Sequence, residues 1–266
     1  MNYSQKTALV TGASSGIGEV FAHELAQKGC DLVLVARSEE KLQQIAANLQ
    51  NTFSIRVTVI STDLSIIGAD DYIKGEIDRL GLSVDILINN AGFGTLGRFD
   101  EIPLERIRQE MQLNMLSLTG LTQQFLGELK ERREGVIVNV ASLTAFQPVP
   151  YMAVYAATKA YVLSFTEALW AEYHNSGVRI MALCPGETKS SFHITSGSEH
   201  LTSKRMEPID VVHAAFRAID KDCSSVIAGR GNYIMAQLPR WLPRNTVVRL
   251  MKRVFQPALS AIEHNL

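Results

Sequence analysis

The stretch TALVTGASSGIG at residues 7–18 decides the fold of this chain. Its first residues are apolar or β-branched, as in a short buried strand, and a helical pattern begins at its end. Gly12 permits a tight turn, Gly16 lets the backbone approach a pyrophosphate, and Gly18 lets the helix pack close to a sheet. The start of that helix adds unpaired N–H groups and the positive end of its dipole. The turn therefore predicts a phosphate-binding site that consists of Gly12, Ser14, Ser15, Gly16, Ile17 and Gly18.

Strand patterns and helical patterns alternate along the rest of the chain. Strands are expected at 7–11, 32–36, 57–61, 86–89, 136–140 and 178–183, with a further one at 225–228. Helices are expected at 17–28, 39–50, 70–80, 104–129, 154–175 and 208–219. This order predicts an α/β protein with a doubly wound parallel sheet in three layers (α/β/α), and one domain over residues 1–237. The polar segment 187–205 predicts a loop or a short, mobile pair of helices.

The composition excludes several classes of protein. The chain has 266 residues and balances 26 Lys and Arg against 27 Asp and Glu, so it lacks the basic excess that nucleic-acid binding requires. Its three cysteines are far apart, with no CxxC pair, which argues against a disulfide framework or a metal site. The first residues lead directly into a predicted strand, so we expect no signal peptide there, and no apolar run reaches the about 18 residues of a membrane span. These features predict a soluble, cytoplasmic protein.

The end of the second predicted strand indicates which dinucleotide binds. An acidic residue at this position binds the free 2′-hydroxyl of NAD, whereas an arginine accommodates the 2′-phosphate of NADP. Here the strand is followed by Arg37 and Ser38, and the first carboxylate is Glu39. A guanidinium binds phosphate through two hydrogen bonds, and a serine hydroxyl adds a third. The sequence favours NADP(H); the alternatives are that Arg37 is a solvated charge and that the cofactor is NAD.

Four polar residues could carry out acid–base chemistry beside a bound cofactor. Tyr155 and Lys159 are four positions apart, so they share one face of a predicted helix. An ammonium group near a phenol favours the phenolate and predicts a lowered pKa for Tyr155. Ser142 follows a predicted strand, where its hydroxyl could bind a substrate oxygen, and Asn114 could hold a water within the long helix 104–129. Tyr-x-x-x-Lys alone is weak, because the same pair occurs on many solvated helix faces.

Taken together, these motifs resemble the short-chain dehydrogenase/reductases, over about the first 220 residues. The motifs occur in that family's order: TGASSGIG at 11–18, NNAG at 89–92, Asn114, Ser142, YAATK at 155–159 and Pro185-Gly186. The resemblance implies a Rossmann-type fold with about seven parallel strands and a catalytic tetrad of Asn114, Ser142, Tyr155 and Lys159. In that tetrad Tyr155 is the general acid or base, Ser142 positions the substrate oxygen, Lys159 lowers the phenol pKa and binds the nicotinamide ribose, and Asn114 supports a water chain.

The same resemblance implies further contacts with the cofactor. They fall after the third, fourth and sixth predicted strands, at Asp63, Leu64, Asn90, Ala91, Gly92, Pro185, Gly186, Thr188 and Ser190. Two positions depart from the family's pattern. Ser190 stands where threonine is common, and Glu187 stands where apolar residues or proline are frequent. The hydroxyl survives at Ser190, so we expect Glu187 to affect substrate preference more than cofactor binding.

The predicted substrate pocket is mostly apolar and consists of Phe93, Ser142, Leu143, Met152 and Tyr155. It favours a hydrophobic ketone or alcohol and a reaction of the carbonyl reductase type. The alternative from another functional class is a non-catalytic regulator that binds NADP(H).

Residues 238–266 form a basic, amphipathic extension, expected to cap the cleft or pack in an interface. Peripheral contact with a membrane is the less favoured alternative. The long helices 104–129 and 154–175 resemble the family's subunit interface and imply a homodimer or homotetramer.

Overall fold

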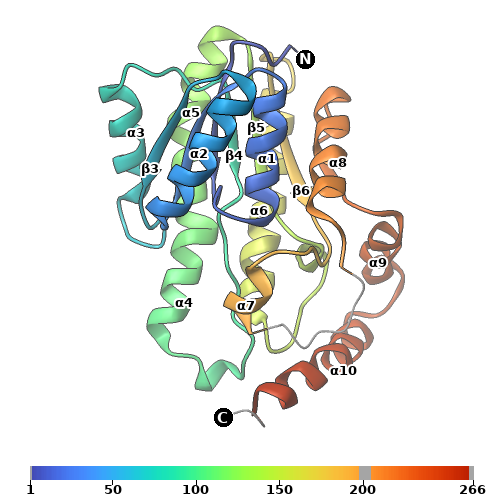
Figure 1. The fold of residues 1–266 in the computed structure, drawn as a ribbon. Helices are drawn as coiled ribbons and strands as arrows, with labels where there is room; N and C mark the ends of the chain where they lie inside the picture. The colour runs from blue at the N-terminus through green and yellow to red at the C-terminus, as the bar shows by residue number, and fades with distance from the viewer. Residues whose placement is uncertain (1, 198–204, 264–266) are drawn as a thin grey trace.

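The computed structural model describes residues 2–197 and 205–263, and its centre is one parallel sheet (Figure 1). The strands lie in the order β3-β2-β1-β4-β5-β6-β7, and each pairs with its neighbours in parallel. Their bounds are β1 Thr7–Thr11, β2 Asp31–Ala36, β3 Val57–Ser61, β4 Ile86–Asn89, β5 Gly135–Val140, β6 Val178–Cys184 and β7 Ser225–Ile227. The predicted doubly wound sheet of seven strands is confirmed, with each predicted strand end within one residue of the observed one.

The strands are apolar throughout because both faces of the sheet are covered. Ala8 and Val10 of β1 point to one buried cluster, whereas Leu9 between them points to the other. The first cluster contains side chains of α1 (Gly16–Gln27), α2 (Glu39–Phe53) and α8 (Pro208–Asp220). The second contains side chains of α3 (Ala69–Arg79) and α5 (Leu118–Arg132), with α6 (Ala153–Tyr173) at its edge. This arrangement is the three-layer α/β/α sandwich that the alternating pattern predicts.

The long helix predicted at 104–129 is interrupted. It consists of α4 (Leu104–Met111), a π-helical segment η2 (Gln112–Ser117) and α5, and Asn114 lies in the wider π-helical turn. Two short helical segments lie nearby, η1 (Phe99–Glu101) and η3 (Leu143–Phe146). Such π-helical insertions are rare in proteins, and those that occur are often located at functional sites. The carboxamide of Asn114, which lies in this turn, is bound to the backbone of Phe93 outside the helix.

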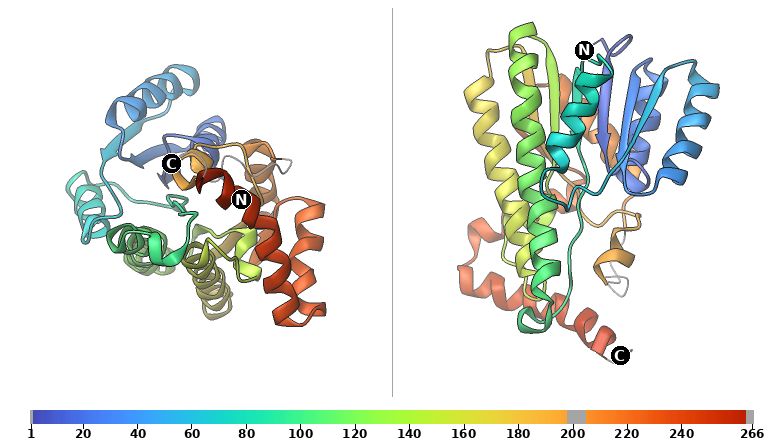
Figure 2. Two further views of the ribbon diagram at one scale, coloured as in Figure 1. Left: turned by 90° about the horizontal axis from the view of Figure 1, so that it is seen from below. Right: turned by 90° about the vertical axis from the view of Figure 1, so that its left-hand side faces the viewer.

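The second half of the chain builds the other end of the molecule. In the described part of the segment 187–205 there is a short helix, α7 (Phe192–Ser196); residues 198–204 lie outside the description. Helices α9 (Arg230–Trp241) and α10 (Arg244–Glu263) follow β7. The C-terminal extension was predicted to begin at residue 238, but this residue lies inside α9. Helices α7 and α10 lie beyond the carboxyl edge of the sheet, where α10 crosses the end of the molecule (Figures 1 and 2).

The sheet has one topological switch point, between β1 and β4. The chain runs outward from β1 through β2 to β3, then returns to β4 on the other side of β1. Helices that leave β1 and β4 depart to opposite faces, which opens a crevice at the carboxyl ends of these strands. The glycine turn, the residues after β4 and the start of α6 all belong to this edge of the sheet.

Candidate active site

The glycine turn between β1 and α1 leaves no space for side chains at its glycine positions. Gly12 has a positive φ of 66°, and a Cβ atom at Gly18 would lie 2.3 Å from the Gly12 carbonyl oxygen. Ser15 precedes α1, and its hydroxyl makes no capping hydrogen bond to the helix. The N–H groups at the start of α1 therefore point to the crevice without a side-chain partner. This cradle suits a pyrophosphate, for which backbone N–H groups and a helix N-terminus are sufficient ligands.

Asn90 holds this turn against the end of β4. Its side-chain amide donates to the carbonyl oxygens of Thr11 (2.9 Å) and Gly12 (3.3 Å), and its backbone N–H donates to the Thr11 hydroxyl at 2.9 Å. Ala91 donates to the same hydroxyl at 3.0 Å. The predicted cofactor contacts at Asn90 and Ala91 thus lie at the crevice, with the Asn90 amide used to fix the shape of the turn.

The predicted adenosine end of the site is open to solvent. The Arg37 side chain is 70% exposed, and its Nη1 lies 4.0 Å from Oδ2 of Asp63. The other oxygen of Asp63 accepts from the backbone and the hydroxyl of Ser65, which fixes that carboxylate. Ser38 precedes α2 and makes no side-chain capping bond, so Arg37, Ser38 and the start of α2 are available to one phosphate group. The Leu64 side chain, by contrast, is buried in the core beneath the sheet.

The loop after β6 closes the crevice from the opposite side. Pro185 accepts a hydrogen bond from Leu143 N at 2.8 Å, and the Thr188 hydroxyl donates to Gly186 at 3.0 Å. A Cβ atom at Gly16 would lie only 2.7 Å from Cβ of Ser190, so the loop touches the glycine turn. The structure therefore brings the predicted contacts of the 185–190 loop to the same crevice as the turn.

Tyr155 and Lys159 lie on the inward face of α6, and both side chains are almost fully buried. Lys159 Nζ donates to the Val140 carbonyl oxygen at the end of β5 (2.8 Å) and lies 5.8 Å from the centre of the Tyr155 ring. Ser142 follows β5 and accepts a hydrogen bond from Thr144 N at 3.1 Å, which fixes the turn that presents its hydroxyl. The Ser142 hydroxyl also lies near the Tyr155 phenol and acts to lower its pKa.

Burial controls the protonation of this pair. Desolvation raises the pKa of the Tyr155 phenol far above its ordinary value, and the nearby Ser142 hydroxyl offsets only part of this rise. Desolvation also lowers the pKa of Lys159 to about 8, against opposing effects of Cys184 and Glu110. The direction predicted for Tyr155 was wrong: the loss of hydration is the largest effect on its pKa, and Lys159 Nζ is engaged by the Val140 carbonyl oxygen. The phenol carries its proton at neutral pH and can donate it.

Asn114 is fully buried beside Lys159. Its Nδ2 donates to the Phe93 carbonyl oxygen (2.8 Å) and to the Thr158 hydroxyl (3.1 Å), and its Oδ1 accepts from Phe93 N at 3.2 Å. A Cβ atom at Gly92 would lie 3.0 Å from Asn114 Oδ1 and 3.3 Å from Lys159 Nζ. Glycine at this position thus allows the segment after β4 to pass between these two polar groups.

An apolar cluster surrounds Tyr155 on the side away from the sheet. Met152 and Tyr155 pack there with side chains of α10, and the Phe192 ring of α7 lies 5.2 Å from the Tyr155 ring. The buried members of this cluster are Leu96, Val149, Met152, Tyr155, Ala156, Val247, Met251, Phe255 and Ala258. The sequence identified Met152 but missed Leu96 and Val149. Periodicity predicts an amphipathic α10 but does not predict the surface that its apolar face covers.

Phe93 and Leu143 take different places from the predicted pocket wall. The Phe93 ring lies under the guanidinium of Arg106, 4.0 Å from its central carbon, and is not part of the apolar cluster. Leu143 begins η3 and is partly exposed. Both residues adjoin the site through their backbones, because Phe93 N binds Asn114 and Leu143 N binds Pro185.

Over residues 2–197 and 205–263, no group of three or more His, Cys, Asp or Glu side chains could hold a metal ion. Within the same residues, no helix has the length and apolar character needed to cross a membrane.

Comparison with known proteins gives the same family as the motifs. Residues 6–200, well over half of the chain, match the short chain dehydrogenase family. The very-long-chain 3-oxoacyl-CoA reductase of Mus musculus is 36% identical over 182 residues, which cover 67% of this chain but only 58% of that relative. An uncharacterized oxidoreductase of Staphylococcus epidermidis is 33% identical over 81% of this chain and 91% of its own length.

Solved structures agree with this assignment. A short-chain dehydrogenase from Sphingobium yanoikuyae in complex with NADPH superposes with a TM-score of 0.81 at 32% identity, covering 89% of this chain and 91% of its own. A bulky-bulky ketone specific alcohol dehydrogenase from Comamonas testosteroni gives a TM-score of 0.77 at 29% identity, covering 91% and 93%. The motif order, the sheet order and these matches agree, and the chain belongs to the short-chain dehydrogenase family.

Proposed function

We propose that this protein is an NADP(H)-dependent reductase that transfers a hydride to the carbonyl carbon of a hydrophobic ketone, with Tyr155 as the proton donor. The observation that carries the proposal is the buried, protonated phenol of Tyr155, which lies near the Ser142 hydroxyl and between the cofactor crevice and an apolar wall. A panel of ketones, aldehydes and acyl thioesters, followed by the absorbance of NADPH, tests it. Turnover of apolar carbonyls is expected, and turnover of polar sugars alone would contradict it.

The geometry supports a separate role in the reaction for each of three residues. The nicotinamide, when bound, supplies the hydride. Ser142 orients the carbonyl oxygen toward the phenol and stabilises the charge that develops on it. Tyr155 donates its proton to that oxygen as the carbon accepts the hydride. Lys159, held by Val140, places a positive charge beside the phenolate that results.

Arg37 supports NADP(H) over NAD. Replacing Arg37 with alanine is expected to weaken NADPH binding by about ten- to hundredfold, because a hydrogen-bonded charge on the 2′-phosphate contributes about 1.5–3 kcal/mol. NADH binding should stay nearly unchanged, since NADH has no such phosphate. Fluorescence titration of both cofactors measures the ratio, and Arg56→Ala, at an arginine paired with Asp31 on the surface, is the matched control. Equal loss for both cofactors would contradict the assignment.

The pKa of Lys159 predicts how the reaction rate declines at alkaline pH. The ammonium form exists below the pKa of about 8 and is lost above it, so kcat/KM for reduction should fall as the pH rises through about 8. In Lys159→Arg the charge persists at all accessible pH values, so the decline should disappear from this range even though the rate is lower. A decline at the same pH in both proteins would show that another group causes it.

The apolar wall and the named relatives support a bulky, hydrophobic substrate. The names of a very-long-chain 3-oxoacyl-CoA reductase and of a bulky-bulky ketone specific alcohol dehydrogenase, to which the chain is similar, support a large substrate. In this chain the side chains of α10 that face Tyr155 are Val247, Met251 and Phe255, which offer no charge to a polar substrate. We therefore propose that α10 caps the substrate side of the site.

A further inference from the structure

Glu110 is a buried carboxyl group that the reaction proposed above does not use. It lies in α4 with an exposed fraction of 1%. One oxygen, Oε2, accepts a hydrogen bond from the Thr95 hydroxyl at 2.8 Å, whereas Oε1 is buried and has no hydrogen-bond partner among the described residues. Leaving a buried polar atom unpaired costs about 1–3 kcal/mol. A structural role alone does not explain this cost, because an apolar side chain would fill the same place.

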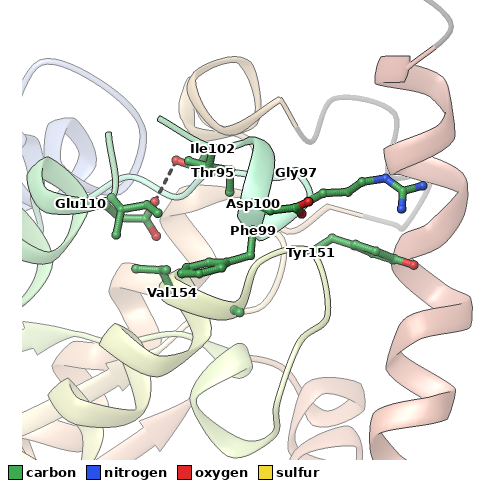
Figure 3. Close-up of a pocket in the computed structure, with 11 residues that line it drawn as sticks. Thr95, Gly97, Phe99, Asp100, Ile102, Glu110, Tyr151 and Val154 are labelled. Atoms are coloured by element: carbon green, nitrogen blue, oxygen red, sulfur yellow. Dashed lines mark hydrogen bonds between the residues drawn. The ribbon is translucent and has the colours of Figure 1, made fainter. Parts of the chain in front are cut away.

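The carboxyl group of Glu110 lines a cavity of about 320 Å³ (Figure 3). The cavity lies between the 95–102 segment, α4 and the start of α6, and three of its lining residues, Arg98, Phe99 and Asp100, are exposed at the surface. Its volume accommodates on the order of ten waters, since each occupies about 30 Å³ in the liquid. Solvent in the cavity therefore lies against the wall to which Glu110 belongs, while the Glu110 side chain itself is only 1% exposed.

On its inner side, Glu110 adjoins the catalytic groups. It precedes Asn114 by one helical turn, and Asn114 and Lys159 flank Gly92 together. Glu110 interacts electrostatically with both Lys159 and Tyr155. Thr95, its hydrogen-bond partner, follows Gly94, whose backbone lies against the Tyr155 ring: a Cβ atom there would be 2.9 Å from the ring. One face of Glu110 thus borders the cavity and the other borders the Tyr155 site.

The proposed reaction creates a demand for protons at this place. Each reduction removes one proton from a phenol that is only 8% exposed, and the next turnover requires its replacement. We propose that Glu110 is the carboxyl group through which protons pass from the cavity to Lys159 and Tyr155. This inference rests on the proposed reduction at Tyr155. Glu110 does not touch the substrate or the cofactor in this proposal. It acts through Lys159 and Tyr155 and is therefore a positioning residue, not a catalytic one.

The proton transfers balance as follows. Tyr155 gives its proton to the substrate oxygen and becomes a phenolate. The phenolate takes a proton from the Lys159 ammonium, Lys159 takes one from the Glu110 carboxyl, and the Glu110 carboxylate takes one from water in the cavity. Each of the three groups is restored after one cycle, and one proton leaves the solvent. Where two of them are farther apart than a hydrogen bond, a bridging water completes the path.

The protonation of Glu110 suits this task. Burial raises the pKa of Glu110 to about 7, against the opposing effects of Thr95, Arg106 and Lys159. Both the acid and the carboxylate are therefore populated near neutral pH, as a group that gives and takes protons requires. The titratable and charged groups around it, from the cavity rim, α4 and α6, are Arg98, Asp100, Arg106, Tyr151, Tyr155 and Lys159.

Glu110→Gln tests the proposal, because glutamine keeps an acceptor for Thr95 but carries no exchangeable acid proton. We expect kcat for reduction to fall about tenfold or more, with unchanged KM and cofactor affinity and a larger solvent isotope effect. The step that Glu110 adds to the pH profile near pH 7 should disappear. In Glu110→Ala, formate or acetate that enters the cavity should restore part of kcat. The control is Glu105→Gln, at an exposed position of the same helix.

The outcomes separate the two proposals. If Glu110→Gln keeps the wild-type kcat and pH profile while Tyr155→Phe is inactive, proton supply through Glu110 is wrong and the reduction at Tyr155 stands. A fall in melting temperature with an unchanged rate per folded molecule would also overturn it. An infrared difference spectrum, wild type minus Glu110→Gln, gives a readout that needs no turnover. It should show a carboxylic acid band that titrates near pH 7, and its absence would contradict the proposal even without a known substrate.

Discussion

Replacing Tyr155 with phenylalanine is expected to lower kcat for carbonyl reduction by about a hundred- to ten-thousandfold, the usual contribution of a general acid. The substitution removes only the hydroxyl group. The ring keeps its place against Gly94 and Phe192, so the fold and the apolar cluster should be preserved. Steady-state kinetics measures the loss, and fluorescence titration should show nearly unchanged NADPH affinity.

The control for this experiment is Tyr161→Phe, at a tyrosine farther along α6 whose hydroxyl forms a hydrogen bond with the Thr119 hydroxyl at 2.9 Å. It should retain wild-type kcat. If Tyr155→Phe binds NADPH and reduces a carbonyl at the wild-type rate, Tyr155 is not the proton donor. Another group in the crevice would then be the general acid.

Replacing Gly18 with alanine is expected to abolish measurable cofactor binding and to destabilise the fold by about 1–3 kcal/mol. The added Cβ would lie 2.3 Å from the Gly12 carbonyl oxygen and 2.5 Å from the Asn90 amide, so the turn must move away from α1. The N–H groups of the turn would then lose their alignment with the pyrophosphate. NADPH titration and thermal unfolding measure the two effects, with a melting temperature lower by several degrees.

A matched control for Gly18 lies in α5. Gly127 is also a helical glycine, but a Cβ atom there would meet no other atom within 4 Å. Gly127→Ala is therefore expected to stabilise the protein by about 0.5–1 kcal/mol and to leave NADPH affinity unchanged. Loss of cofactor binding in both variants, or in neither, would show that the close contact at Gly18 does not shape the site.

The strands and the cofactor crevice could be predicted because local sequence determines them. A strand buried on both faces is continuously apolar, and the glycines of the turn are required by contacts at a fixed spacing. The π-helical turn at Asn114 could not be predicted, because periodicity does not reveal contacts such as the one between Asn114 and Phe93, 21 positions earlier. The pKa of Tyr155 was predicted in the wrong direction for a similar reason: helical spacing reveals the neighbouring Lys159 but not the extent of burial.

Glu110 was missed although the sequence contains a sign of it. Ile107, Glu110 and Asn114 are spaced by three and four positions, so they share one face of the predicted helix, and Ile107 marks that face as buried. An acidic residue on the apolar face of an amphipathic helix departs from the usual pattern. Without the packing of the 95–102 segment against α4, however, sequence reasoning assigns such a residue to solvent.

The enclosure of Tyr155 by α7 and α10 has a consequence for how this protein would discriminate among substrates. With 8% of Tyr155 exposed and the Phe192 ring 5.2 Å away, a bulky molecule reaches the phenol only after part of the apolar wall has moved. A bound substrate then reacts faster than it dissociates. Selection is expected to fall on the entry step, so that kcat/KM follows the shape and flexibility of a molecule more closely than the intrinsic reactivity of its carbonyl group.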